Sequence, residues 1–176
     1  MSDKDYQKWD AIHLERGFFP PSPSSHITRC QEFLPPAGGA AALDVAGGSG
    51  RHALWLAERG FEVTLVDISP AALRIAGEEA EKRDLVLKTF RADLEHDPFP
   101  GGPWDVILCF HYLHRPLFKS FAQTLSPSGM LIIVQPTLRN LERHPRPSAR
   151  FLLAEGELSD LAVANGLEMV LFEEGW

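Results

Sequence analysis

The sequence has 176 residues, 44% of them hydrophobic and 23% charged, which is the composition of one globular domain with a full core. Its formal net charge of −7 argues against a general nucleic-acid or membrane-surface binder, because neither polyanion attracts an acidic protein. Two cysteines are too few for a disulfide framework and no apolar run approaches the ~18 residues that span a bilayer, so we expect a cytoplasmic protein.

The first 36 residues are predicted to form a helical cap ahead of the main fold. Residues 4–16 have the pattern of a short polar helix, and the prolines at 20, 21 and 23 end it. A second helix is predicted over 24–33. Two roles are open for Trp9, Phe18 and Phe19: they cover one edge of the core, or they form a lid over a bound ligand.

The rest of the chain is organised around residues 42–52, which predict a strand, a glycine turn and a helix. A short apolar run is followed by three glycines, and apolar residues then recur at helical spacing. Glycine lets a ligand lie against the backbone, and the free N–H groups of the helix start face that ligand. The pattern predicts a cofactor-binding turn of the Rossmann kind, with a glycine turn that binds nothing as the alternative.

Three acids stand at the ends of predicted strands. Asp44 is near the end of the first strand, Asp67 closes a strand over 61–67, and Asp93 follows a strand over 85–90. Asp67 comes 17 residues after Gly50, near the spacing at which a carboxylate accepts hydrogen bonds from a ribose. The alternative for Asp67 is an acid that only caps the next helix.

The remaining chain continues the alternation of strands and helices. We expect a helix over 70–82, a strand over 104–110, a helix over 116–125, a turn over 126–129, a strand over 130–134, a basic loop over 139–150, a helix over 155–165 and a last strand over 167–172. This pattern predicts a doubly wound, parallel α/β sheet in one domain, with the cap over 1–36 and the core over 37–176. The three acids then meet at the ligand edge of the sheet.

From Ala40 onward the chain resembles the class I S-adenosylmethionine (SAM) dependent methyltransferases, and among them the tellurite-resistance-like group. The resemblance is carried by the segments 44–51, 56–60, 66–69, 92–94, 109–117 and 151–158, which include Asp-Val-Ala-Gly-Gly-Ser-Gly-Arg and Val-Asp-Ile-Ser. Ala46 stands where the family has its first glycine.

The resemblance implies SAM as the cofactor and S-adenosylhomocysteine (SAH) as the product. In the family the first acid lies near the positive amino-acid end of SAM, the second meets the ribose and the third accepts from the adenine amino group. The implied cofactor-binding residues are Asp44, Ala46, Gly47, Gly48, Gly50, Arg51, Asp67, Ile68, Asp93, Leu94 and Phe110.

The acceptor site of this fold lies past the fourth and fifth strands. His111 and Tyr112 are therefore the catalytic candidates, for acceptor positioning or proton removal, unless they are simply satisfied at a strand end. The candidates for substrate binding are Trp9, His114, Arg115, Arg143 and Arg146. The two last arginines could hold an anionic acceptor or merely balance an acidic C-terminal helix.

We expect methyl transfer to a small molecule, such as a thiol, a metalloid oxyanion or another small metabolite, with no metal and no nucleic acid. One alternative is a SAM-binding regulator or partner protein without catalysis. The other is an NAD(P)-dependent oxidoreductase, against which stand Asp44, Asp93 and the lack of a Tyr-x-x-x-Lys pair.

The family's seventh strand, which lies between the fifth and the sixth, has no apparent counterpart before Trp176. Because an exposed sheet edge invites pairing with another chain, we expect either a homodimer through this edge or a rearranged last strand.

Overall fold

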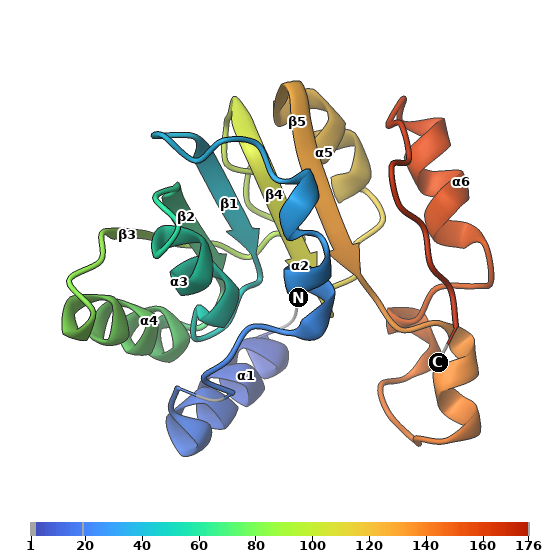
Figure 1. The fold of residues 1–176 in the computed structure, drawn as a ribbon. Coiled ribbons are helices and arrows are strands. Elements are labelled where there is room, and N and C mark those ends of the chain that lie inside the picture. The colour runs from blue at the N-terminus through green and yellow to red at the C-terminus, as the bar shows by residue number, and fades with distance from the viewer. Residues whose placement is uncertain (1–2, 19, 176) are drawn as a thin grey trace.

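A parallel five-stranded sheet forms the centre of the computed structural model, which describes residues 3–18 and 20–175 (Figure 1). The order of the strands in the sheet is β3-β2-β1-β4-β5. The strands are β1 (Ala41–Val45), β2 (Glu62–Asp67), β3 (Leu87–Arg91), β4 (Trp104–Phe110) and β5 (Leu125–Val134). The order reverses at β1, as in a doubly wound fold, and confirms the predicted α/β class.

Helices cover both faces of the sheet. They are α1 (Asp3–Arg16), α2 (Ser25–Arg29), α3 (Arg51–Ala57), α4 (Pro70–Lys82), α5 (Leu117–Thr124) and α6 (Glu157–Ala164), with 3₁₀ turns η1 (Gln31–Phe33), η2 (Leu138–Glu142) and η3 (Ala149–Phe151). None of the helices in the described part of the chain is long and apolar enough to cross a lipid bilayer. The predicted second helix is divided, because Cys30 leaves the helical path between α2 and η1.

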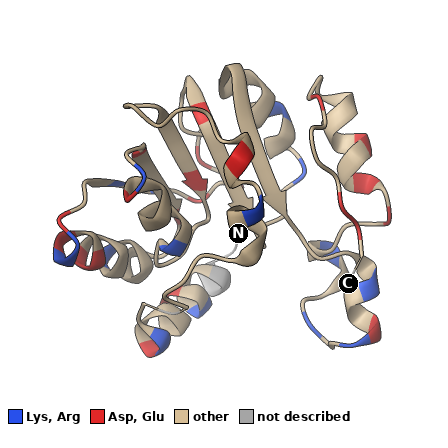
Figure 2. Ribbon diagram, viewed as in Figure 1, with Lys and Arg blue, Asp and Glu red and all other residues tan. Residues whose placement is uncertain are grey.

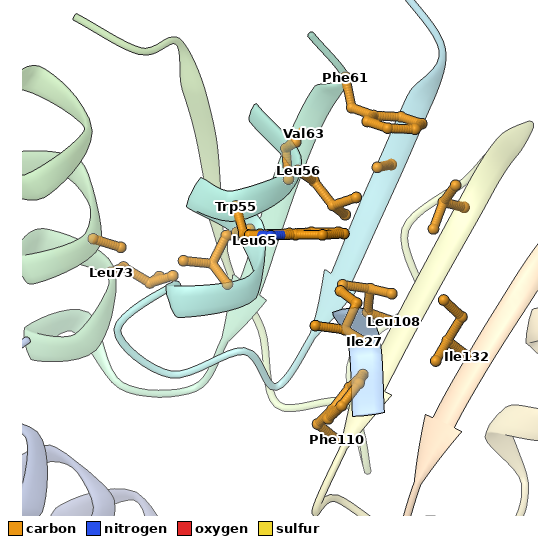
Figure 3. Close-up of a cluster of buried hydrophobic side chains, with 14 residues drawn as sticks. Ile27, Trp55, Leu56, Phe61, Val63, Leu65, Leu73, Leu108, Phe110 and Ile132 are labelled. Atoms are coloured by element: carbon orange, nitrogen blue, oxygen red, sulfur yellow. The ribbon is translucent and has the colours of Figure 1, made fainter. Parts of the chain in front are cut away.

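Alternate residues of the strands supply two hydrophobic layers, one on each face. Leu56 of α3 and Ile27 of α2 pack with Leu65 and Leu108 on the face shown in Figure 3. On the other face, α5 packs on the strands through Phe118, Phe121 and their neighbours. Strands buried on both faces read as continuous apolar runs, which is why they could be found in the sequence.

The predicted strand over 167–172 is wrong. Residues 167–175 form no strand, and Val170 is 66% exposed. The segment Leu167–Phe172 has apolar side chains on both faces, so it would need cover on both sides, and no described strand lies beside the outer edge of β5.

The predicted turn over 126–129 lies within β5. The pairing with β4 passes from Trp104 opposite Leu125 to Val106 opposite Met130, so the residues between bulge out of the ladder. Ser128 in this bulge has a positive φ of 65°, the conformation expected of a turn residue. Residues 126–129 therefore include a backbone conformation typical of a turn, although β5 continues through them.

Candidate functional site

The glycine turn joins β1 to α3 at the edge of the sheet where the strands end. Ala46, Gly48 and Gly50 have φ values of 51°, 58° and 82°, in the left-handed region. At Gly47 a Cβ atom would lie 2.5 Å from side-chain atoms of both Asp44 and Leu65. The turn therefore needs its glycines at 47, 48 and 50, and tolerates alanine at 46 at the cost of a strained φ.

Asp44 is a buried carboxylate with one oxygen unused. Its side chain is 1% exposed, and its Oδ2 accepts a 3.1 Å hydrogen bond from the Ala53 N–H. The Oδ1 atom is buried without a partner. Burial raises the pKa of Asp44 to about 7, against the lowering effect of the Ala53 bond. The Oδ1 atom of this carboxylate thus lacks a hydrogen-bond donor that would stabilise its charge.

Arg51 lies at the start of α3, near this carboxylate. Its guanidinium is half-buried, and no hydrogen bond or ion pair joins it to another described residue. Burial lowers the pKa of Arg51, and the charge of Asp44 raises it. An unused carboxylate oxygen and an unpaired guanidinium next to one turn are complementary to the ammonium and carboxylate of an amino acid.

Asp67, the last residue of β2, ties the glycine turn to the neighbouring strand. Its Oδ2 accepts from the Gly48 N–H at 2.8 Å and its Oδ1 from the Ser69 N–H at 2.9 Å. Burial raises the pKa of Asp67, and these two bonds oppose the rise. Ser69 itself caps α4, because its hydroxyl accepts from the Ala72 N–H. The capping role that was the alternative for Asp67 is therefore filled by Ser69.

Asp93 follows β3 by two residues and lies half-buried. Its Oδ2 is 2.9 Å from His96 Nδ1, and its Oδ1 accepts from the Glu95 N–H at 3.1 Å. Leu94 beside it is buried and Ile68 is half-buried. An acid with apolar neighbours thus stands at the ends of β2 and β3, where the resemblance leads us to expect the adenine.

The end of β4 supplies the catalytic candidates. His111 has a φ of 59°, and its N–H donates to the Val134 carbonyl at 2.8 Å. Surrounding protein lowers the pKa of His111, and the charges of Arg51 and His26 lower it further. The Tyr112 hydroxyl is buried without a partner, and burial raises its pKa. Phe110 lies against the buried His52 ring, with ring centroids 4.2 Å apart.

Gln135, which directly follows β5, is a site residue that the sequence did not reveal. Its Nε2 donates to the Phe151 carbonyl at 2.7 Å, while its Oε1 is buried without a partner. Ser24, next to α2, has the same kind of unpaired oxygen, and its N–H donates to His52 Nε2 at 3.3 Å. No pattern of spacing or polarity distinguishes these two residues in the sequence.

Most of the unpaired atoms lie on residues at the strand ends. Among the described residues, four buried side-chain polar atoms lack a hydrogen-bond partner, on Ser24, Asp44, Tyr112 and Gln135. Each belongs to the edge where the strands end or, for Ser24, to the segment bonded to α3 at that edge. Since buried polar atoms are nearly always paired, this concentration indicates a place that a polar ligand completes.

A groove of about 1380 Å³ runs beside β5. Its lining includes His26, His111, Gln135 and Asn140, the outer edge of β5 and residues 166–175. The groove therefore reaches the ends of β4 and β5, where the acceptor was expected.

The substrate-binding candidates lie in several places. The guanidinium of Arg115 bonds Glu157 of α6 at 2.9 Å and the Leu152 carbonyl at 3.2 Å, so it anchors α6. His114 is half-buried beside it. Arg143 and Arg146 are exposed in the loop between η2 and η3, and neither lines the groove. Figure 2 shows basic positions in this loop and acidic positions on α6, in keeping with the charge-balance alternative.

The N-terminal cap contributes two side chains to which the sequence assigned no role. Asp10 Oδ1 accepts from the Ser69 hydroxyl at 2.7 Å and from the Ala71 N–H at 2.9 Å. His13, on the same face of α1, lies against Gly48. Trp9 is 42% exposed, and Phe19 lies outside the described residues. The spacing of three residues between Asp10 and His13 was the available signal.

Among the described residues, no group of three or more His, Cys, Asp or Glu side chains is placed to hold a metal ion.

Comparison with known proteins gives matches over the same region. The sequence model of the methyltransferase domain family matches residues 42–129, half of the chain. The chain is 34% identical over 100 residues to the demethylmenaquinone methyltransferase of Thermus thermophilus, covering 53% of this chain and 46% of that protein. It is 39% identical over 108 residues to the glycine/sarcosine N-methyltransferase of Parasynechococcus marenigrum, covering 54% and 38%. The matched region thus spans less than half the length of these relatives.

A solved structure shares the fold. The SAM-dependent methyltransferase from Aquifex aeolicus superimposes with a TM-score of 0.62 at 19% identity, over 94% of this chain and 88% of that one. At this identity the likeness concerns the fold alone.

Proposed function

Because the chain belongs to the methyltransferase domain family, we propose that it transfers a methyl group from S-adenosylmethionine to a small-molecule acceptor. The family assignment confirms the class and the cofactor expected from the motifs.

The observation that carries the proposal is the pair formed by Asp44 and Arg51. Oδ1 of Asp44 is buried and unpaired, and the Arg51 guanidinium has no partner among the described residues. The amino-acid end of SAM brings an ammonium and a carboxylate, which are the two groups that this pair lacks. A dinucleotide such as NAD brings neither group to that place. The residues present therefore fit SAM, whereas the oxidoreductase alternative leaves Oδ1 of the buried Asp44 carboxylate without a donor.

The other cofactor contacts follow from the same edge. Asp67 and Asp93 would hold the ribose and the adenine, and the glycine turn would lie against the cofactor without steric conflict. Bound SAM supplies an electrophilic methyl group on a sulfonium. The work left to the protein is to hold the acceptor in line with this methyl group and to exclude water.

The acceptor is proposed to lie in the groove next to His111 and Gln135. Both residues line the groove, and the unpaired Gln135 Oε1 is suited to accept a hydrogen bond from an acceptor hydroxyl or amine. We infer that His111 removes or relays the acceptor proton. The protein around His111 keeps its pKa low, so that the ring is neutral and able to accept a proton at pH 7. Tyr112 does not line the groove, and with Glu95 and Asp93 acting on its hydroxyl it would serve as a neutral donor on the cofactor side.

The matched relatives suggest which acceptors to examine. Their names specify demethylmenaquinone in one case and glycine or sarcosine in the other. The tellurite-resistance-like resemblance adds a metalloid oxyanion. Among these acceptors, glycine and sarcosine carry an amine that would donate a hydrogen bond to Gln135 Oε1.

Two measurements test the proposal. Titration calorimetry should show binding of SAH and SAM but not of NADH, and the binding should be lost in Arg51→Ala. Radiolabelled SAM should then be consumed with a demethylmenaquinol analogue, glycine, sarcosine or tellurite. NADH binding in place of SAH would refute the cofactor. SAH binding without turnover on the whole panel would favour the non-catalytic SAM-binding alternative.

A further inference from the structure

The helix α1 lies next to α4, at the sheet edge where the cofactor is proposed to bind (Figure 1). Asp10 joins α1 to the start of α4 through its bonds from the Ser69 hydroxyl and the Ala71 N–H. The Arg91 guanidinium at the end of β3 lies 5.1 Å from the centre of the Tyr6 ring. Contacts with the start of α4 and with the end of β3 thus hold α1 in place.

His13 of this helix fills the space that Gly48 leaves open. His13 Cε1 lies 2.9 Å, and Nε2 3.4 Å, from the position that a Cβ atom on Gly48 would take. A glycine in such a turn is useful because a ligand can approach the backbone there. In this structure the His13 imidazole, and not a ligand, lies against Gly48.

The same imidazole stands beside the acid assigned to the ribose. The charge of Asp67 acts on His13, whose pKa it raises against the stronger lowering effect of burial. Asp67 is only 6% exposed. Each of its oxygens already accepts one backbone N–H and keeps a lone pair for a further donor. With the His13 ring against Gly48, the approach to this side of the glycine turn is occupied.

We propose that His13 occupies the place of the cofactor's ribose, and that α1 is a gate which Asp10 latches to the N-terminus of α4. The chain as described is then in a closed, self-inhibited form, and α1 must release before SAM binds. The inference rests on the proposed function, since it takes Asp67 as the ribose-binding acid.

The exchange of His13 for a ribose is chemically favourable. The ring nitrogens of His13 make no hydrogen bond to another described residue. Two ribose hydroxyls would instead donate to Asp67, and bonds to a charged acceptor are the stronger kind. The latch is also weak enough to open, because it consists of two hydrogen bonds that are only partly buried.

The test is the rate at which SAH binds, followed by stopped-flow fluorescence, with calorimetry for the dissociation constant. In the full chain, His13→Ala removes the blocking ring and Asp10→Ala removes the latch. Both should speed SAH association and tighten binding, and for Asp10→Ala the loss of two hydrogen bonds corresponds to a change of roughly tenfold. Leu14→Ala, at a neighbouring position that is 60% exposed, is the matched control and should change neither quantity. Far-UV circular dichroism of each variant checks that the fold is intact.

Weaker SAH binding in both His13→Ala and Asp10→Ala would overturn the gate, because it would mean that α1 clamps bound cofactor. Unchanged rates in both would overturn it as well. Hydrogen exchange at the Ala71 amide gives an independent readout: Asp10→Ala should speed exchange there, and SAH should speed it in the unmodified protein. If no protein in the series bound SAH, the proposed function itself would fail. If the unmodified protein bound SAH and both variants bound it with the same rate and dissociation constant, only the gate would be refuted.

Discussion

Replacing Asp44 with Asn should make the empty protein more stable above neutral pH while abolishing cofactor binding. The change keeps the size of the side chain, and the Asn oxygen can still accept from the Ala53 N–H. It removes a negative charge that is buried with one oxygen unpaired and that forms no ion pair with another described residue. We therefore expect the charged Asp44 side chain to lower the unfolding free energy of the protein when no cofactor is bound.

The magnitude follows from the pKa of Asp44. Burial raises it from 3.8 to about 7, a shift of about three units, which corresponds to roughly 4 kcal/mol. Between pH 4 and 7 the folded protein holds a proton on Asp44 that the unfolded chain has lost. The Asp44 contribution to stability therefore falls as pH rises through this window and is constant above it. In the Asp44→Asn variant the new side-chain amide has no acceptor, which offsets about 1–3 kcal/mol of the gain.

The assay is urea unfolding of both proteins from pH 5 to pH 8. The wild-type curve alone is ambiguous, because burial lowers the pKa of His52 to about 3 and this makes stability rise with pH in an overlapping window. The difference between the two proteins cancels this term. We expect the variant to gain on the wild type as pH rises, and to exceed it by about 1–3 kcal/mol at pH 8.

A stability difference that is the same at pH 5 and pH 8 would refute the reasoning, since it would place the pKa of Asp44 near its ordinary value. Saturating SAH supplies the control. It should raise the unfolding free energy of the wild type at pH 8 and leave that of the variant unchanged.

Three further predictions concern the fold. Leu108→Ala, at a fully buried position in β4, should lower the unfolding free energy by about 2–5 kcal/mol in urea, and a loss below about 1 kcal/mol would mean that the core can collapse around the site. Gly47→Ala should lower the unfolding free energy by ~1–3 kcal/mol, because the new Cβ would meet Asp44 and Leu65. Gly77→Ala in α4 should instead raise it by ~0.5–1 kcal/mol, because no atom lies within 4 Å of the new Cβ. Equal effects of the two changes in thermal unfolding would contradict the steric conflict at Gly47. The edge strand β5 contains no charged residue that would discourage pairing with another chain. Analytical ultracentrifugation should therefore detect a homodimer whose fraction grows with protein concentration. A monomer mass that stays constant with concentration would contradict pairing at this edge.

The elements that the sequence predicted well are those whose ends carry their own chemistry. The helix Pro70–Lys82 has the predicted bounds because Ser69 caps it and Pro70 fits its first position. The strand Trp104–Phe110 is bounded by a proline and a polar segment. In both cases the local signal and the buried core favour the same structure.

The prediction that failed, and the residues that the sequence did not reveal, depended on neighbours distant in the sequence. The apolar pattern of Leu167–Phe172 is typical of a strand, but a strand also needs a partner, and the described chain places none beside it. Gln135 and Ser24 became site candidates only through partners they lack, which no sequence pattern records. His13 is a further case, since its contact with Gly48 requires knowing where α1 docks.

The distribution of the unpaired atoms bears on whether the chain is an enzyme or only a cofactor-binding protein. A protein that merely binds SAM needs the complement of the amino acid, the ribose and the adenine, which Asp44, Arg51, Asp67 and Asp93 provide. Such a protein gains nothing from an unpaired oxygen on Gln135, which lines the groove past the end of β5, and burying this oxygen without a partner costs stability. The atom is explained if a second molecule in the groove completes it, and for an enzyme that uses SAM this second molecule would be the methyl acceptor.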